Sequence, residues 1–310
     1  MAGDMMPGTK SRRAGGRAAR VAARSAPLAE SLRPIRAGLT GGHYKPLGDE
    51  DVARIHHAAL DALETIGLID APASGVEVMT RAGAILGDDG RLRFPRALVE
   101  DMPAEAARGN TLNGRNPKHD LHLVGNNVHF GTAGAAVSVV DPNTGAYRDS
   151  TLADLHDAAR LVEHLDNIHF FQRVMVARDL TGNLELDLNT IYAACAGTGK
   201  HVGTSFCEPD TVAPCIDLLH EIAGGEDAWR ARPIVSNSNC FVVPPFKFAT
   251  ESCLVMEKAI AAGMPVLLLS AGQAGATAPA PIAAAIVQAV AECLAGVVYV
   301  LSLIHISEPT

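Results

Sequence analysis

From about residue 166 onwards, short apolar runs alternate with amphipathic stretches of helical length. The runs centre near Phe170, Val202, Ile234 and Val266, with a period of roughly thirty residues, the size of one β-α unit. Within each run the apolar residues are nearly continuous rather than alternating, as expected of strands buried on both faces. The pattern therefore predicts four successive β-α units that form a parallel sheet covered by helices.

The boundaries of these units follow from the apolar runs and the residues that flank them. The predicted strands are Ile168–Val176, His201–Cys207, Pro233–Cys240 and Pro265–Ser270, and the predicted helices are Leu186–Ala196, Val212–Ala223, Phe248–Ala262 and Ile282–Ala295. A fifth strand is expected to begin at Val297–Leu301. A doubly wound sheet and a TIM barrel both fit such units, and the barrel needs eight. Because the pattern breaks off without a polar wind-down, we expect an α/β fold of the TIM (β/α)8 type, truncated after about four units, over residues 151–301.

Residues 40–150 have a different pattern, typical of an α+β region. Helices are predicted after Gly48 and over Gly75–Ala82, and a further helix over Leu152–His164, capped by Ser150 or Thr151, follows this region. Short extended pieces are expected at Arg91–Phe94, Asp120–Val124 and Val128–Gly131, and a hairpin joins Ala135–Asp141 to Tyr147-Arg148 through Asn143-Thr144-Gly145. We expect this region to pack against the β-α units.

Composition narrows the class of protein. The chain is 48% hydrophobic with a net charge of −8, which fits a soluble protein and argues against nucleic acid as the main partner. Six cysteines without metal spacing indicate reduced thiols in a cytoplasmic protein. The apolar run Ile282–Val300 is interrupted by Gln288, Glu292 and Gly296, so it is interpreted as a buried helix leading into a strand rather than a membrane span.

Residues 1–39 are basic and poor in acids, and no apolar segment typical of a secretory signal follows. An Arg-rich start of this kind is also seen in transit peptides. We interpret it instead as a disordered or docking arm.

Candidate chemistry gathers where the predicted strands end, which is where ligands bind in both candidate folds. Strand one leads to Gln172 and Arg173, strand two to Thr204 and Ser205, strand three to Ser236–Asn239, and strand four to Ser270–Gln273. The residues predicted to bind a substrate are Gln172, Ser205, Asn237, Asn239, Ser270 and Gln273. The alternative is that these polar residues only terminate strands and cap helices.

Common catalytic motifs are missing from this cluster. The sequence contains neither GxSxG nor HExxH, and Gly197-Thr198-Gly199-Lys200 lacks the flanking residues of a P-loop. No two histidines share the spacing of a metal site with a third ligand, so structural or surface roles are favoured and no metal site is predicted. His201 starts strand two, the end of a barrel associated with stability.

Longer motifs resemble the trimethylamine methyltransferase family, which includes the glycine betaine corrinoid methyltransferases. The matching segments are Phe130–Asp141, Arg148–Asp154 leading to Leu165–His169, Lys200–Ser205 and Ala274–Pro279 with the helix that follows. The resemblance covers about residues 30–300. It is specific enough to separate this family from other barrels, although it does not choose a substrate within it.

The resemblance implies a TIM barrel that moves a methyl group from a methylated amine (trimethylamine or a quaternary amine such as glycine betaine) to a corrinoid, a cobalamin carried by a partner protein. Reduced cobalt is then the nucleophile, so the barrel itself binds no cofactor directly and needs no strong nucleophile. This fits the neutral strand ends. A quaternary ammonium also favours an aromatic cage, for which Phe171, Phe241, Phe246 and Phe248 are candidates, alongside ordinary core packing. The chemistry is that of methanogenesis, and the full-length protein is expected to be a homo-oligomer.

Two departures from the family bear on these expectations. Members that use trimethylamine carry pyrrolysine on a later barrel strand than the four predicted in this chain. The last residues, 302–310, resemble a translated sequencing adapter and are expected to be artefactual, so the chain is expected to be an inactive fragment. The competing hypotheses are another TIM-barrel or doubly wound enzyme, such as an aldolase, and a small-molecule binding module.

Overall fold

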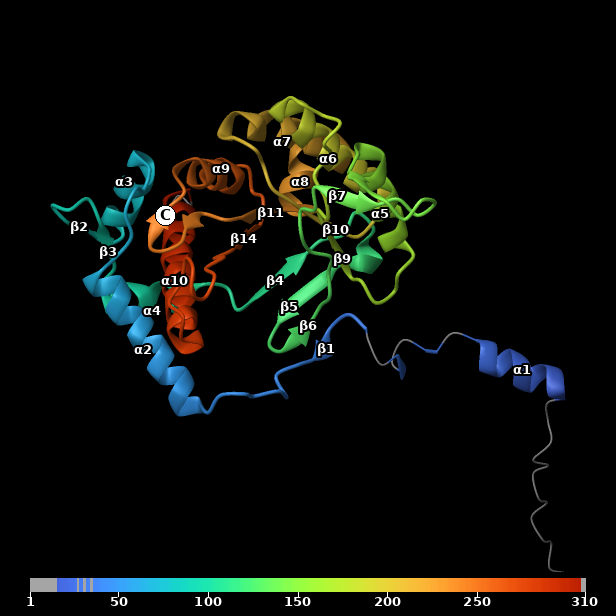
Figure 1. Ribbon diagram of the computed structural model, residues 1–310, viewed down its shortest axis with the longest axis horizontal. Coiled ribbons are helices and arrows are strands. Elements are labelled where there is room, and N and C mark those ends of the chain that lie inside the picture. The colour runs from blue at the N-terminus through green and yellow to red at the C-terminus, as the bar shows by residue number, and fades with distance from the viewer. Residues whose placement is uncertain (1–15, 27, 30–31, 34–35, 308–310) are drawn as a thin grey trace, which may run out of the picture. The chain divides into compact units, whose positions relative to one another are not determined.

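The computed structural model describes residues 16–307, except for residues 27, 30–31 and 34–35 (Figure 1). The chain divides into two compact units, Met1–Arg36 and Ala37–Thr310. In the first unit Arg17–Ser25 form helix α1, with Arg24 in the last turn, where a positive charge complements the helix dipole. Much of the arm predicted at residues 1–39 lies outside the described residues, and its docking role stays a prediction.

A four-stranded parallel sheet is the centre of the second unit. Its strands are β9 (Phe170–Gln172), β10 (His201–Thr204), β11 (Val235–Asn239) and β14 (Val266–Leu268). They lie side by side in chain order, and Val202 is paired with both Phe171 and Val235. The four predicted β-α units are therefore confirmed, with strands shorter than the sequence pattern predicts.

Helices connect these strands and cover the sheet. They are α5 (Leu152–Glu163), α6 (Asn183–Gly197), α7 (Pro209–Ala223), α8 (Glu226–Ala231) and α9 (Thr250–Ala261). Phe171, Val202 and Val235 are buried against apolar side chains of these helices, in a core that includes Ile191 and Trp229. The predicted cap of α5 is Thr151, which forms a capping box with Asp154.

The α+β region predicted at residues 40–150 consists of short strands and helices. Its elements are β1 (Leu39–Thr40), α2 (Asp49–Thr65), α3 (Ala73–Arg81), β2 (Ile85–Leu86), β3 (Leu92–Arg93), α4 (Arg96–Glu105), β4 (Gly109–Leu112), a 3-10 turn (Pro117–His119), β5 (Leu121–Val124), β6 (Asn127–Val128), β7 (Ser138–Val140) and β8 (Tyr147–Asp149). The predicted hairpin is confirmed, since β7 pairs with β8. Helix α4 is an addition that the sequence pattern did not predict.

The fifth strand predicted at Val297–Leu301 is wrong, because these residues belong to one long helix, α10 (Ile282–Ser307). Ala291, Ala295, Val298 and Ser302 are all buried, and their spacing is that of one helix face rather than of a strand. Gly296 permits the close approach of the Phe241 ring, which a Cβ at this position would overlap. The apolar residues of this run are therefore buried by the packing of a helix and not by the pairing of a strand.

Helix α10 packs against α2, α3, α4 and α9, so the N-terminal region does contact the β-α units (Figure 1). By length and composition α10 is the one helix among the described residues that is long and apolar enough to cross a membrane. It nevertheless buries Glu292, which accepts a hydrogen bond from the backbone N–H of Phe246 at 2.9 Å. We therefore interpret it as a packing helix.

The parallel sheet is open, and the described residues form no closed barrel. On one side, residues Gly131 and Ala136 make isolated bridges to the β9 segment, and Thr132 Oγ1 donates to the Gln172 carbonyl at 2.6 Å. On the other side, no described strand pairs with the free edge of β14. Short antiparallel pairs complete the structure, including β12 (Val242–Val243) with β13 (Lys247–Phe248). The fold is thus mixed α/β, with a parallel sheet that has one covered and one free edge.

Candidate functional site

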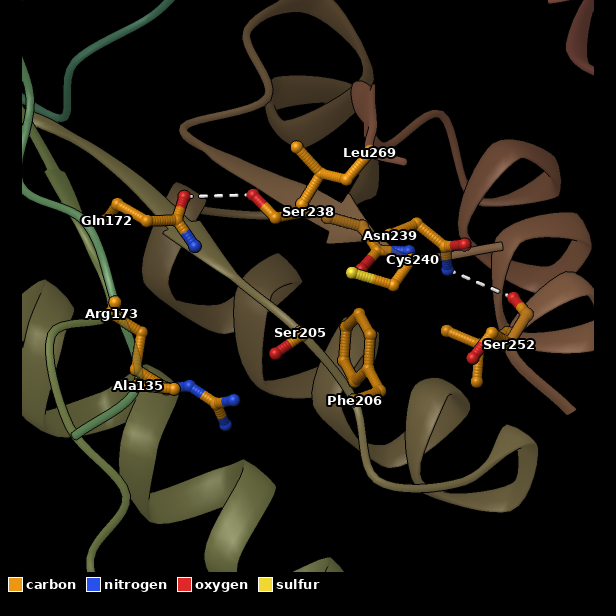
Figure 2. A pocket seen from close by; sticks show the side chains of 13 residues that line it. Ala135, Gln172, Arg173, Ser205, Phe206, Ser238, Asn239, Cys240, Ser252 and Leu269 are labelled. Atoms are coloured by element: carbon orange, nitrogen blue, oxygen red, sulfur yellow. Dashed lines mark hydrogen bonds between the residues drawn. The ribbon is translucent and has the colours of Figure 1, made fainter. Parts of the chain in front are cut away.

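A cavity of about 300 Å³ lies at the carboxyl ends of β9, β10 and β11 (Figure 2). The strand ends contribute Gln172 and Arg173, then Ser205 and Phe206, then residues 237–240, and helix α9 contributes Ser252 and Val255. Among the described residues that line it, Arg173 is the one charged side chain, and there is no carboxylate, histidine or lysine. The cavity wall therefore mixes apolar groups with neutral hydrogen-bonding groups and one cation.

Four of the six predicted site residues line this cavity together, namely Gln172, Ser205, Asn237 and Asn239. They come from three adjacent strands, as the sequence pattern required. Whether they bind a substrate stays a prediction.

Ser270 and Gln273 lie outside the cavity lining. The Ser270 hydroxyl donates instead to the Glu292 carboxylate of α10. Gln273 is exposed, and its backbone N–H donates to Thr277 Oγ1 at 2.9 Å in a turn beyond β14. The chain after β14 turns towards α10, so the fourth strand end contributes Leu269 to the cavity lining but neither of these two polar residues.

Hydrogen bonds between neighbouring elements orient two of the cavity's amides. Ser238 Oγ donates to Gln172 Oε1 at 2.9 Å, and Asn239 Nδ2 donates to the Ser252 carbonyl at 3.0 Å (Figure 2). The Gln172 carboxamide also lies over Gly203 of β10, where a Cβ would overlap it. The lack of a side chain at Gly203 therefore permits this position of Gln172.

Asn237 has a buried amide group without a protein partner. Its side chain is 0% exposed, and neither Oδ1 nor Nδ2 forms a hydrogen bond within the described part of the chain. Oδ1 of the neighbouring Asn239, itself 4% exposed, is unpaired as well. Buried polar atoms are nearly always paired in native proteins, because each unpaired one costs about 1–3 kcal/mol. Unpaired amide atoms on a cavity wall are what a site for a polar ligand provides.

Arg173 follows β9 directly, and its guanidinium extends into the cavity toward Ser205 and Phe206 (Figure 2). Its side chain makes no hydrogen bond or ion pair with the described residues. Burial lowers the pKa of Arg173, since desolvation disfavours the charged form, and the charges of Cys207 and Asp187 oppose this shift. The strand end thus holds a partly desolvated cation.

The aromatic cage predicted from Phe171, Phe241, Phe246 and Phe248 is not formed at this cavity. Phe171, Phe241 and Phe248 are 0% exposed and belong to the hydrophobic cores. Phe206 lines the cavity instead and was missed, because the predicted second strand extended to Cys207 and placed Phe206 inside it. Cys240 was missed in the same way, since the third strand was predicted to end on it.

Histidine and cysteine have mainly structural roles in the described residues. His201 is 1% exposed, with Nδ1 at 2.8 Å from the Asn113 carbonyl and Nε2 at 2.9 Å from Ser236 Oγ. All six cysteines are free, and three of them, Cys195, Cys215 and Cys253, are buried. No group of three or more His, Cys, Asp or Glu side chains in the described part of the chain is arranged to hold a metal ion.

Comparison with known proteins identifies the relatives of this chain. Residues 13–305 match the sequence model of the trimethylamine methyltransferase (MTTB) family. The chain belongs to the trimethylamine methyltransferase family. The cavity described above is therefore the candidate substrate site of a member of this family.

The relatives include proteins named for two different amines. Trimethylamine methyltransferase MttB of Desulfitobacterium hafniense is 30% identical over 251 residues, which cover 81% of this chain and 50% of the relative. Trimethylamine methyltransferase MttB1 of Methanosarcina mazei is 26% identical, over 84% of this chain and 53% of the relative. Glycine betaine methyltransferase of D. hafniense is 26% identical, over 82% and 52%. The chain spans about half the length of these curated relatives.

Proposed function

We propose that this chain is part of a methyltransferase that moves a methyl group from a methylated amine to a corrinoid carried by a separate protein. The observation that carries the proposal is the cavity at the strand ends, whose wall offers neutral hydrogen-bonding groups and no carboxylate, histidine or lysine among the described residues. The amine is trimethylamine or a quaternary amine such as glycine betaine, the two substrates for which the relatives are named.

The chain's own residues position the amine. In the transfer, the bond between the methyl carbon and nitrogen breaks, the nitrogen keeps the electron pair, and the methyl carbon bonds to the acceptor. The partner's corrinoid supplies the nucleophile. Asn237, Asn239 and Gln172 fix the orientation of the amine, because holding the reacting atoms in line contributes much of the rate in such displacements. No residue needs to gain or lose a proton in this step if the substrate is a quaternary amine.

We further propose that the parallel sheet is one half of a TIM barrel. Two observations support this. The strands lie in chain order with every neighbour parallel, and no described strand pairs with the free edge of β14. A structure of the protein expressed from the complete reading frame is expected to have a further parallel strand beside β14. A helix or an antiparallel strand there would contradict the proposal.

The activity is tested with the protein from the complete reading frame and the 310-residue chain in parallel. Each is mixed with a reduced corrinoid protein and with deuterium-labelled glycine betaine or trimethylamine. With the protein from the complete reading frame, mass spectrometry is expected to detect the demethylated amine and the label on the corrinoid protein, and both signals should require all three components. The 310-residue chain is expected to give neither signal. If the amine binds but loses no methyl group to the corrinoid protein, the proposed transfer is wrong.

A further inference from the structure

Arg173 bears on which methylated amine the cavity accepts, and this step rests on the proposed function. A guanidinium in a cavity needs an anionic partner, because an unpaired charge out of water is costly. Among the described residues none supplies one. Arg173 therefore has its charge and its hydrogen-bond donors available to whatever enters the cavity.

The carboxylate of Asp187, whose charge influences Arg173, is already occupied. Asp187 is 1% exposed and accepts hydrogen bonds from the backbone N–H of Cys207 at 2.8 Å, from Cys207 Sγ at 3.1 Å and from Thr211 Oγ1 at 2.6 Å. No ion pair joins it to Arg173 within the described residues. Asp187 instead ties the loop after β10 to α6 and α7.

We infer that the amine accepted by this cavity carries a carboxylate as well as its methylated nitrogen, and that Arg173 binds the carboxylate. The guanidinium presents paired N–H donors that match a carboxylate, and such charge-assisted bonds are the strong ones. A compact cation alone, such as protonated trimethylamine or choline, would be repelled by Arg173.

The remaining cavity wall suits the other end of such a zwitterion. Phe206 offers a ring face to a methylated ammonium, and the unpaired Oδ1 atoms of Asn237 and Asn239 add negative partial charge. Arg173 and these groups belong to different strands of one cavity. The wall thus combines one guanidinium with an aromatic ring and unpaired amide oxygens, which fits a betaine better than a simple methylamine.

Calorimetric titration of the complete-reading-frame protein tests this assignment with three probes that share a methylated nitrogen. Glycine betaine carries a carboxylate, choline carries a hydroxyl in its place, and trimethylamine carries neither. The wild type is expected to bind glycine betaine at least tenfold more tightly than choline or trimethylamine. Arg173→Gln should weaken glycine betaine at least tenfold while leaving choline unchanged or tighter, and Arg173→Lys should fall between.

Arg178→Gln is the matched control, because Arg178 lies five residues further along the same segment, is exposed and pairs with Asp149 at 3.5 Å. It should bind all three probes like the wild type. Thermal unfolding separates binding from folding. Arg173→Gln should unfold at no lower temperature than the wild type, since Arg173 has no side-chain partner to lose.

The outcomes distinguish this inference from the proposed function. Binding of all three probes with similar affinity, unchanged in Arg173→Gln, overturns the carboxylate assignment and leaves methyl transfer standing. Acetate serves as a fourth probe, a carboxylate without a methylated nitrogen. If it binds as tightly as glycine betaine, the methylated nitrogen contributes nothing and the proposed function is overturned instead. Failure of every probe to bind overturns both.

Discussion

Polar side chains are buried at both ends of the parallel sheet, and His201 at the amino end differs from Asn237 at the carboxyl end in the partners that it has among the described residues. At the amino end, both ring nitrogens of His201 have partners at 2.8 and 2.9 Å. At the carboxyl end, the amide of Asn237 has none, although Asn237 directly follows the Ser236 that contacts His201. Burial alone therefore does not separate a structural residue from a ligand-binding one, and what distinguishes Asn237 is an amide on a cavity wall without a partner among the described residues.

Among the substitutions that test this contrast, replacement of Lys200 at the amino end of the sheet is expected to lower the protein's stability most. Its Nζ donates to the carbonyls of Val162, Leu165 and Ile168 at 2.6, 2.9 and 2.6 Å, and the residue is 3% exposed. Lys200→Met leaves these carbonyls without their charged donor, so we expect a loss of about 4 kcal/mol in the free energy of unfolding, measured by denaturant titration.

Lys258→Met is the matched control for Lys200→Met. Lys258 also donates to a backbone carbonyl, that of Pro209 at 2.9 Å, but its side chain is 46% exposed. Its replacement should change the free energy of unfolding by no more than about 0.5 kcal/mol. Equal losses in the two variants would show that the three-carbonyl contact is not what stabilises this end of the sheet.

The next largest expected effect is a dependence of the protein's stability on pH, which arises from His201. Burial lowers the pKa of His201 to about 4, so in the folded protein it stays neutral while the unfolded chain takes up a proton at about pH 6.5. The stabilisation is therefore present above pH 6.5 and is lost as the pH falls towards 4. At about 1.36 kcal/mol per pH unit, the loss over this window is about 3 kcal/mol.

Denaturant titrations between pH 7 and pH 4 measure this loss for His201. Burial lowers the pKa of His119 and His169 in the same direction, so the informative quantity is the difference between the wild type and His201→Gln. His201→Gln should be less stable at pH 7 and should lose less stability on acidification. His43→Gln, at an exposed position, should follow the wild type. Parallel pH profiles for the wild type and His201→Gln would be evidence against a buried neutral imidazole.

The regular part of the fold was predictable because periodicity is a local signal. Apolar runs about thirty residues apart located all four strands, and Thr151 was among the predicted caps. The predicted strands were too long, since β9 ends at Gln172 and β10 at Thr204 although apolar residues follow in both segments. The strand predicted at Val297–Leu301 was wrong for the same reason, because an apolar run alone does not distinguish a strand from a buried helix.

Site residues that are positioned by the end of a strand were predictable from the sequence. Residues whose position depends on a loop were not. Gln172, Ser205, Asn237 and Asn239 reach one cavity because parallel strands carry them to the same edge. The direction of the chain after β14 depends on contacts with Glu292, which lies 22 residues beyond Ser270, and no local pattern indicates such a contact. The partnerless state of Arg173 is equally invisible in the sequence, because it depends on which acids already have partners.

Replacements of Ser236 and Asn237 are expected to change the free energy of unfolding least. They also allow the most direct comparison of a paired with an unpaired side chain, because the two residues are adjacent on β11 and nearly equally buried. Ser236→Ala removes the partner of His201 Nε2 and should cost about 1 kcal/mol. Asn237→Leu exchanges an unpaired amide for an apolar group of similar volume, so the free energy of unfolding should stay the same or rise by about 1 kcal/mol. The same variant should lose amine binding, which Ser236→Ala should keep. If Asn237→Leu instead destabilises the protein more than Ser236→Ala does, the amide of Asn237 stabilises the fold. The contrast between a structural residue at one end of the sheet and a ligand-binding residue at the other would then be wrong for Asn237, the residue on which it mainly rests.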